Sequence, residues 1–150
     1  MELFRISAEK FSHQLSASGA SNRWNKRGEF VIYTGGSRSL STLELVVHRN
    51  AVRPDIPYRL MIISVPDADT YLKTLPTTDL PANWRKFEAY SRLQEIGSRW
   101  YASRESLILK VPSAIIPSEH NYIINTKHEA FEEHVKLVRT EKYFWDDRLL

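Results

Sequence analysis

Short runs of apolar and β-branched residues predict five strands. Over 29–34, Phe30 and Ile32 fall on one face, and Val31 and Tyr33 fall on the other. Four further runs of this kind predict strands over 58–65, 107–111, 121–125 and 135–139. The stretch 67–81 between them is broken by Pro and Thr and is expected to be irregular.

Apolar positions three to four residues apart predict three helices. Ser41-Thr42-Leu43-Glu44 has the capping-box pattern, in which the Glu binds backbone N–H groups, so a short helix is expected over 41–49. A longer helix is expected over 84–102, where aromatic and apolar residues recur at helical spacing: Phe87, Tyr90, Leu93, Ile96 and Trp100. A third, short helix is expected near 129–134.

The order of these elements predicts an α+β fold. Helices and strands do not alternate regularly, and no glycine-rich turn follows a strand, which disfavours a doubly wound nucleotide-binding fold. The chain has 150 residues, the usual size of one domain, and shows no internal repeat. We therefore expect a single domain over 1–150, with a split, largely antiparallel sheet and flanking helices.

Composition narrows the class of protein. The chain has no Cys, which excludes disulfides, cysteine-based zinc sites and a thiol nucleophile, and fits a reducing compartment. The N-terminal residues do not resemble a secretory signal, and no apolar stretch approaches the roughly 18 residues of a membrane span. We expect a soluble, cytoplasmic protein with no membrane partner.

The formal net charge of +3 is modest. Its ordinary explanation is a solvated surface, but Arg23, Lys26 and Arg27 could form an anion site, because a phosphate needs converging donors and not a large net charge. The sequence has no run of Lys and Arg and no glycine-flanked aromatic motif, so direct nucleic-acid binding is disfavoured.

Several common catalytic motifs are absent. There is no phosphate-binding loop, no G-x-G-x-x-G and no G-x-S-x-G. The five His residues include no H-E-x-x-H, and His128 and His134 are six positions apart, so they do not share a helix face. No metal site and no serine-hydrolase site is expected.

Three local features could carry chemistry. Arg23 beside Trp24 can offer a guanidinium to a phosphate next to an apolar wall, although composition alone favours a surface Arg and a core Trp. Tyr33 at a strand end and Glu44 on the following helix could flank a sugar, the carboxylate stabilising positive charge at an anomeric carbon. Their structural alternatives are a core aromatic ring and a capping-box Glu. Ser106, at a helix-to-strand junction, could bind a ligand or simply form a turn.

Together these features resemble the RES-domain family, the toxins of bacterial toxin–antitoxin pairs, named for a conserved Arg-Glu-Ser. The resemblance spans nearly the whole chain, in order, through these stretches: Phe4-Arg5-Ile6, Arg23-Trp24-Asn25, Val31-Ile32-Tyr33-Thr34, Leu43-Glu44, Leu80-Pro81, Trp84-Arg85, Gly97, Trp100, Arg104-Glu105-Ser106, Val111-Pro112-Ser113-Ala114, Asn121-Tyr122-Ile123-Ile124-Asn125 and Asp147-Arg148-Leu149.

The resemblance implies a fold like that of ADP-ribosyltransferases such as diphtheria toxin, with a cleft for NAD. It implies depletion of NAD by hydrolysis or phosphorolysis of the nicotinamide–ribose bond, or ADP-ribosylation of a protein. By motif, Arg23, Tyr33 and Glu44 match the family's active-site Arg, Tyr and Glu, and Ser106 matches its Ser. NAD is then the substrate, and no cofactor is needed.

The implied roles are specific. Arg23 neutralises phosphate charge, Tyr33 packs on the nicotinamide or ribose, Glu44 stabilises the ribosyl cation, and Ser106 positions the ribose or the nucleophile. The implied partner is an Xre-type helix-turn-helix antitoxin that blocks the cleft, and a homodimer is compatible with the sequence. The alternatives are a protein ADP-ribosyltransferase, a non-catalytic binding module and a nucleic-acid-binding protein, the last with strongly salt-dependent affinity.

Overall fold

The computed structural model describes residues 1–48 and 55–149. Within them, seven strands form one sheet in the order β4-β5-β6-β2-β1-β3-β7, antiparallel except for the parallel pair β4 and β5. The strands are β1 (Glu2–Ala8), β2 (Val31–Gly35), β3 (Tyr58–Ser64), β4 (Leu72–Thr74), β5 (Ile108–Pro112), β6 (His120–Asn125) and β7 (Lys136–Lys142). The α-helices are α1 (Arg38–Val47), α2 (Tyr90–Ser103) and α3 (Phe131–His134). Short 3-10 turns cover Glu9–Phe11, Asp69–Tyr71, Thr77–Asp79, Phe87–Ala89 and Asp147–Leu149.

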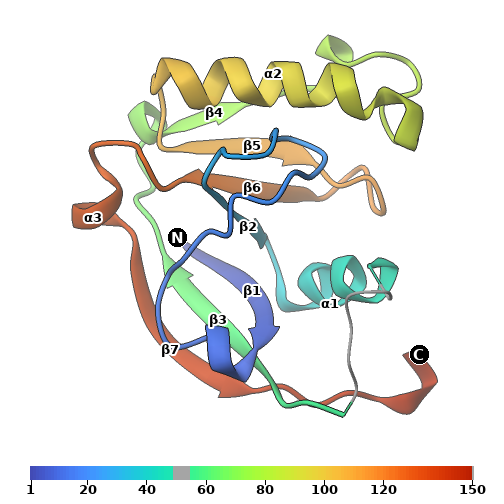
Figure 1. Cartoon of the computed structure of the whole chain (residues 1–150), viewed down its shortest axis with the longest axis vertical. Coiled ribbons are helices and arrows are strands. Elements are labelled where there is room, and N and C mark those ends of the chain that lie inside the picture. The colour runs from blue at the N-terminus through green and yellow to red at the C-terminus, as the bar shows by residue number, and fades with distance from the viewer. Residues whose placement is uncertain (49–54, 150) are drawn as a thin grey trace.

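The sheet is divided into two halves. Strands β1 and β2 meet at a single residue pair, Phe4 with Gly35, whereas β1 and β3 pair along their whole length. Figure 1 shows the two halves, β4-β5-β6-β2 and β1-β3-β7, turned away from each other where β1 and β2 join. This is the single-domain α+β fold with a split, largely antiparallel sheet that the sequence predicts.

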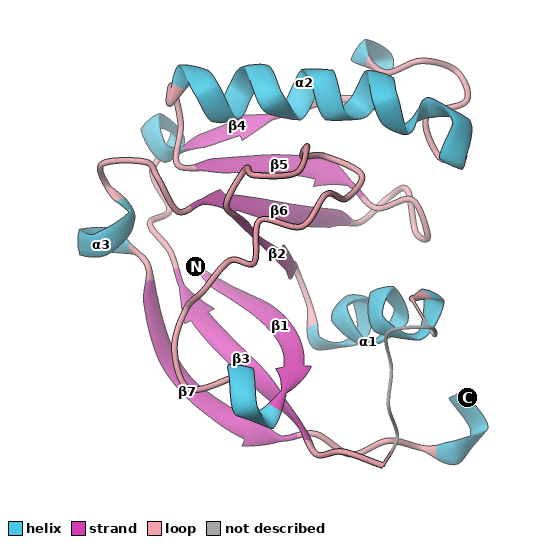
Figure 2. Ribbon diagram, in the orientation of Figure 1, coloured by secondary structure: helices cyan, strands magenta, loops and turns pink. Residues whose placement is uncertain are grey.

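The core lies on both sides of this division. One buried cluster joins residues of both halves: Leu3, Met61 and Ile63 from β1 and β3, and Ile32, Ile108 and Ile124 from β2, β5 and β6. A second cluster lies under α2, which covers one half-sheet in Figure 2 and packs Leu93 and Trp100 against Leu109 and Ile123. The two halves are therefore held together by packing more than by the ladder of backbone hydrogen bonds.

Helix α2 also fixes the segment that precedes β2. A Cβ on Gly97 would clash with the backbone carbonyl of Trp24, so only Gly allows the helix and this segment to come so close. Gln94 Nε2 donates to the carbonyl of Asn22 at 2.8 Å on the same face of the helix. Arg23 is held between these two contacts.

The structure departs from the sequence predictions in four places. The first strand, β1, was not predicted, and β4 lies in the stretch 67–81 that was expected to be irregular. Helix α1 starts at Arg38, where the Ser37 side chain accepts from Leu40 N–H. The predicted capping box at Ser41 is therefore wrong, because Ser41 lies inside the helix and its hydroxyl donates to the carbonyl of Phe4.

The fourth difference is at α2, which starts at Tyr90 and not at residue 84, because turns and a 3-10 segment precede it. The remaining predicted ends differ by a few residues, and residue 49, the predicted end of the short helix, lies outside the described residues. Over the described ranges, no helix combines the length and the apolar composition that crossing a bilayer requires.

Candidate active site

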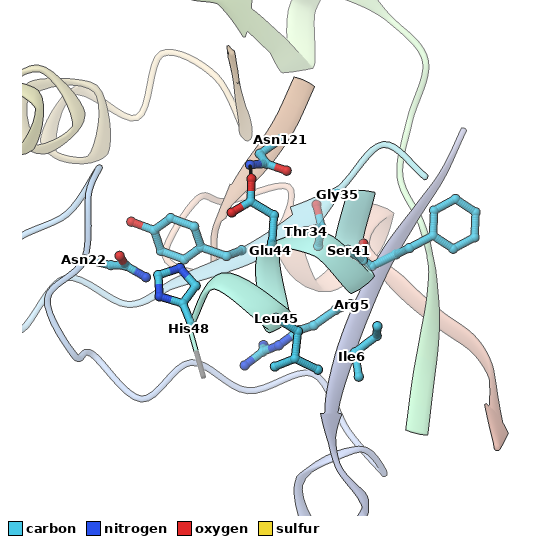
Figure 3. Close-up of a pocket in the computed structure, with 12 residues that line it drawn as sticks. Arg5, Ile6, Asn22, Thr34, Gly35, Ser41, Glu44, Leu45, His48 and Asn121 are labelled. Carbon is cyan, nitrogen blue, oxygen red and sulfur yellow. Dashed lines mark hydrogen bonds between the residues drawn. The ribbon is translucent and has the colours of Figure 1, made fainter. Parts of the chain in front are cut away.

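Two adjoining cavities open where the half-sheets separate. They share five lining residues: Asn22, Tyr33, Glu44, His48 and Asn121. The first, of about 190 Å³, is bordered by β1 and α1, through Phe4, Arg5, Ile6 and Leu45, and is called the β1 cavity (Figure 3). The second, of about 220 Å³, reaches Arg23, Arg85 and Tyr90 and is called the arginine cavity. Glu44 and Tyr33 thus stand at the boundary of the two.

Glu44 projects from α1 and is held by two side chains from the other half-sheet. Its Oε1 accepts from Ser113 Oγ at 2.9 Å and from Asn121 Nδ2 at 2.5 Å, the bond to Asn121 being drawn in Figure 3. Within the described part of the chain, Oε2 has no hydrogen-bond partner and no cation within ion-pair distance. The carboxylate is therefore fixed in orientation, and its second oxygen is available to a ligand.

The hydroxyl of Tyr33 is already engaged by the protein. It donates to Asn25 Oδ1 at 2.6 Å and accepts from the backbone N–H of Trp24 at 3.1 Å. Burial raises the pKa of Tyr33 above its ordinary value, so the phenol stays neutral at physiological pH. Its contribution to the site is a rigid aromatic wall, not an acid or a base.

Arg23 lies in the arginine cavity, where backbone carbonyls and an aromatic ring hold its guanidinium. Its guanidinium donates to the carbonyls of Trp84 at 2.9 Å and Arg85 at 3.3 Å, and lies 4.7 Å from the centre of the Tyr90 ring. Arg85 donates through Nε to the carbonyl of Ala114 at 2.8 Å. In residues 1–48 and 55–149 neither guanidinium has a carboxylate within ion-pair distance. Two fixed, uncompensated cations in one cavity form a site for an anion.

Ser106 is the one predicted site residue that the structure leaves outside both cavities. It is buried, accepts from Trp100 Nε1 at 2.8 Å and donates to the carbonyl of Ile108 at 3.2 Å. Because its hydroxyl both accepts and donates a hydrogen bond, Ser106 connects the end of α2 to the start of β5. The structure thus brings Arg23, Tyr33 and Glu44 together and separates Ser106 from them.

The serine that the structure places beside Glu44 is Ser113, whereas the sequence analysis selected Ser106 to position the ribose or the nucleophile. Ser113 and Asn121 belong to two of the stretches that carry the family resemblance, but neither was assigned a role. The signal was available, since each is a small polar residue at one end of a predicted apolar strand. His48, which also lines both cavities, is four positions after Glu44 and so shares its helix face.

The described residues contain no group of three or more His, Asp or Glu side chains arranged to hold a metal ion. The side chains that line the two cavities provide a fixed carboxylate, an aromatic wall and a pair of guanidinium groups.

Comparison with known proteins agrees with this architecture. The family model described as RES domain matches residues 2–146. Toxin Res of Yersinia enterocolitica is 35% identical over 127 residues, covering 85% of this chain and 82% of the relative. Prs ADP-ribosylating toxin of a Sphingobium species is 34% identical over 140 residues, covering 91% and 86%, and Toxin Res of Pseudomonas putida is 34% identical and covers 99% of both chains. With a family match over almost its whole length and relatives of this similarity, the chain belongs to the RES-domain family.

Proposed function

We propose that this protein is a toxin that cleaves the bond between nicotinamide and ribose in NAD. The observation that carries the proposal is the cleft itself, in which Glu44, Arg23 and Arg85 line one cavity and, among the described residues, one Glu44 oxygen and both guanidinium groups have no oppositely charged partner. Similarity to proteins named as toxins, one of them an ADP-ribosylating toxin, supports both the toxic role and the use of NAD. We place this activity in the cytoplasm, where NAD is available.

The charges of the cleft suit the charges of the reaction. NAD has an anionic pyrophosphate, which Arg23 and Arg85 would bind in the arginine cavity. As nicotinamide departs, positive charge develops on the ribose, and Glu44 at the cavity boundary would stabilise it. Because Ser113 and Asn121 hold one carboxylate oxygen, the other is oriented before the substrate arrives, and little reorganisation is needed during the reaction.

The β1 cavity would receive the nicotinamide ring. Phe4, Ile6 and Leu45 give it apolar walls, and Tyr33 forms the side next to the ribose. Desolvation lowers the pKa of Arg5 in this wall, and none of the described carboxylates pairs with its guanidinium. Its N–H groups can donate to the carboxamide oxygen, and its positive charge favours the neutral departing nicotinamide over the bound cationic ring.

The acceptor of the ADP-ribosyl group can be water, inorganic phosphate or a protein side chain. Each uses the same cleavage, and the relative named Prs ADP-ribosylating toxin gives specific support to transfer onto a protein. A toxin of this kind requires an antitoxin, and we propose an Xre-type helix-turn-helix protein that covers the cleft.

Release of nicotinamide from NAD tests the proposal. Purified protein, freed of bound antitoxin, is incubated with NAD with and without inorganic phosphate, and with NAD labelled in the adenylate group in the presence of cell extract. We expect nicotinamide release that depends on Arg23 and Glu44; a phosphate requirement or protein-bound label would then identify the acceptor. Folded protein that neither releases nicotinamide nor labels protein would contradict the proposal.

A further inference from the structure

A third cavity continues the cleft beyond the arginine cavity. It measures about 490 Å³ and is lined by the segment before α2 and by its first turns, through Phe87, Tyr90, Ser91 and Gln94. It shares Asn22 and Tyr90 with the arginine cavity. The cleft therefore extends well past the residues that the cleavage of the nicotinamide bond requires.

Two aromatic rings form the wall of this third cavity. The Phe87 side chain is 81% exposed, and its ring centre lies 4.8 Å from that of Tyr90. Tyr90 in turn lies against the guanidinium of Arg23. A large apolar ring left open to solvent beside a cationic site is typical of a surface that binds a planar aromatic group by stacking.

We propose that Phe87 and Tyr90 bind the adenine ring of NAD, an inference that rests on the proposed function. The order of groups in the substrate supports it. Adenosine, pyrophosphate, ribose and nicotinamide follow one another in NAD. The aromatic wall, the arginine pair, Glu44 and the β1 cavity follow one another in the cleft.

Gln94 provides a means to recognise the edge of the ring. Its Nε2 is fixed by the bond to the carbonyl of Asn22, so the orientation of the amide is set. Its Oε1 has no donor among the described residues and can accept from the exocyclic amine of adenine. The hypoxanthine analogue of NAD has a carbonyl in place of this amine. Its oxygen would face the Gln94 oxygen, and because both are acceptors, the analogue should bind less tightly than NAD.

The test compares NAD with nicotinamide mononucleotide, which lacks the adenylate half, in wild-type protein and in F87A. We expect F87A to raise the KM for NAD roughly tenfold, by loss of stacking, and to leave kcat/KM for the mononucleotide unchanged. F144A is the matched control, because Phe144 is also 81% exposed but lines none of the three cavities, and it should match wild type. F87W should retain the affinity of the wild type.

A binding measurement separates this inference from the proposed function. AMP is titrated into wild-type, F87A and F144A protein by calorimetry, which needs no cleavage. AMP binding that is weakened in F87A alone supports the adenine site even if no nicotinamide is released. If wild type cleaves NAD but F87A changes neither the KM for NAD nor AMP binding, the adenine site is wrong and the proposed function stands. Absence of both cleavage and AMP binding would overturn both.

Discussion

Among the described residues, the Glu44 side chain accepts both of its hydrogen bonds at the same oxygen, and the two donors lie on β6 and on the residue that follows β5. A Glu that served only the stability of α1 would bond to its own helix, as the capping-box pattern led us to expect. Instead the residue spans the division of the sheet, from α1 in front of one half to the strands of the other. This arrangement holds a carboxylate in place at the mouth of two cavities.

Alanine substitutions distinguish the role of Ser113 from that of Ser106. We expect S113A to lower the rate of nicotinamide release roughly tenfold per folded molecule, because Glu44 loses one of its two donors. S106A should leave that rate unchanged but lower the free energy of unfolding by about 1–3 kcal/mol, since the Trp100 indole N–H is left buried without an acceptor. Rates and urea unfolding measured on both variants check this, and the opposite assignment of effects would contradict it.

The sequence was sufficient to select three residues that line the candidate site, but not the two residues that hold Glu44. Arg23, Tyr33 and Glu44 follow one another within 22 positions around one strand, so local pattern and family resemblance were enough to select them. Ser113 and Asn121 reach the site only because β5 ends and β6 begins beside α1, which depends on strand pairing between residues far apart in the sequence. Ser106 was selected because it belongs to the contiguous Arg104-Glu105-Ser106 motif. In the structure its hydroxyl instead binds the indole N–H of Trp100, which lies in the last turn of α2.

The buried hydroxyl of Tyr33 makes stability depend on pH in the alkaline range. Burial raises the pKa of the folded form, whereas the unfolded chain ionises near the ordinary value of about 10. The unfolded state therefore binds fewer protons above that pH, and the contribution of Tyr33 to stability is complete below pH 10 and is lost as pH rises beyond it. Urea unfolding at rising pH should show this loss in the wild type.

Y33F is the matched variant for that measurement. It has no hydroxyl to ionise, so its stability should fall less steeply above pH 10. At neutral pH it should be less stable than wild type by about 1–3 kcal/mol, because Asn25 Oδ1 and the Trp24 N–H lose their partner. Identical slopes for the two proteins above pH 10 would refute the assignment.

At the scale of elements, the contact between α2 and the segment before β2 positions Arg23. We expect G97A to destabilise the protein by about 3 kcal/mol, because the added methyl group must displace the backbone at Trp24. The same displacement should weaken binding of inorganic pyrophosphate to the folded protein. Thermal unfolding and pyrophosphate titration below the melting temperature check both effects.

Ser98 offers a control at the next position of the same helix. Its hydroxyl is buried and has no partner among residues 1–48 and 55–149, so S98A should leave stability unchanged or raise it by up to about 1 kcal/mol. Comparable destabilisation of G97A and S98A would mean that the close approach at Gly97 has no special role.

The elements that the sequence analysis misplaced were those fixed by their surroundings. Strand β1, Glu2-Leu3-Phe4-Arg5-Ile6-Ser7-Ala8, does not alternate regularly between apolar and polar residues, and its strand character comes from pairing with all of β3. Strand β4 has only three residues and exists because it pairs with β5. The start of α1 was missed because Ser37 and Ser41 are both acceptable caps by type, and the choice of Ser37 frees the Ser41 hydroxyl to bond to Phe4.

At the scale of the molecule, the shared core should make the two half-sheets unfold together. Three of the four Trp, Trp24, Trp84 and Trp100, belong to the cluster under α2, so fluorescence reports mainly on that half. Far-UV circular dichroism reports on the whole sheet. We expect the same denaturation midpoint from both probes, and separate midpoints would show that the core does not couple the halves.

The same division of the sheet is what creates the cleft, because Glu44 and Tyr33 stand where the halves part. The proposed cleavage depends most on the charge of Glu44, and E44Q removes that charge while it keeps an oxygen for Ser113 and Asn121. Nicotinamide release from NAD should therefore fall by roughly 10²–10³-fold in E44Q, with an unchanged melting temperature. E95Q, at an exposed position on α2, should match the wild type. Equal rates for E44Q and the wild type would contradict the account.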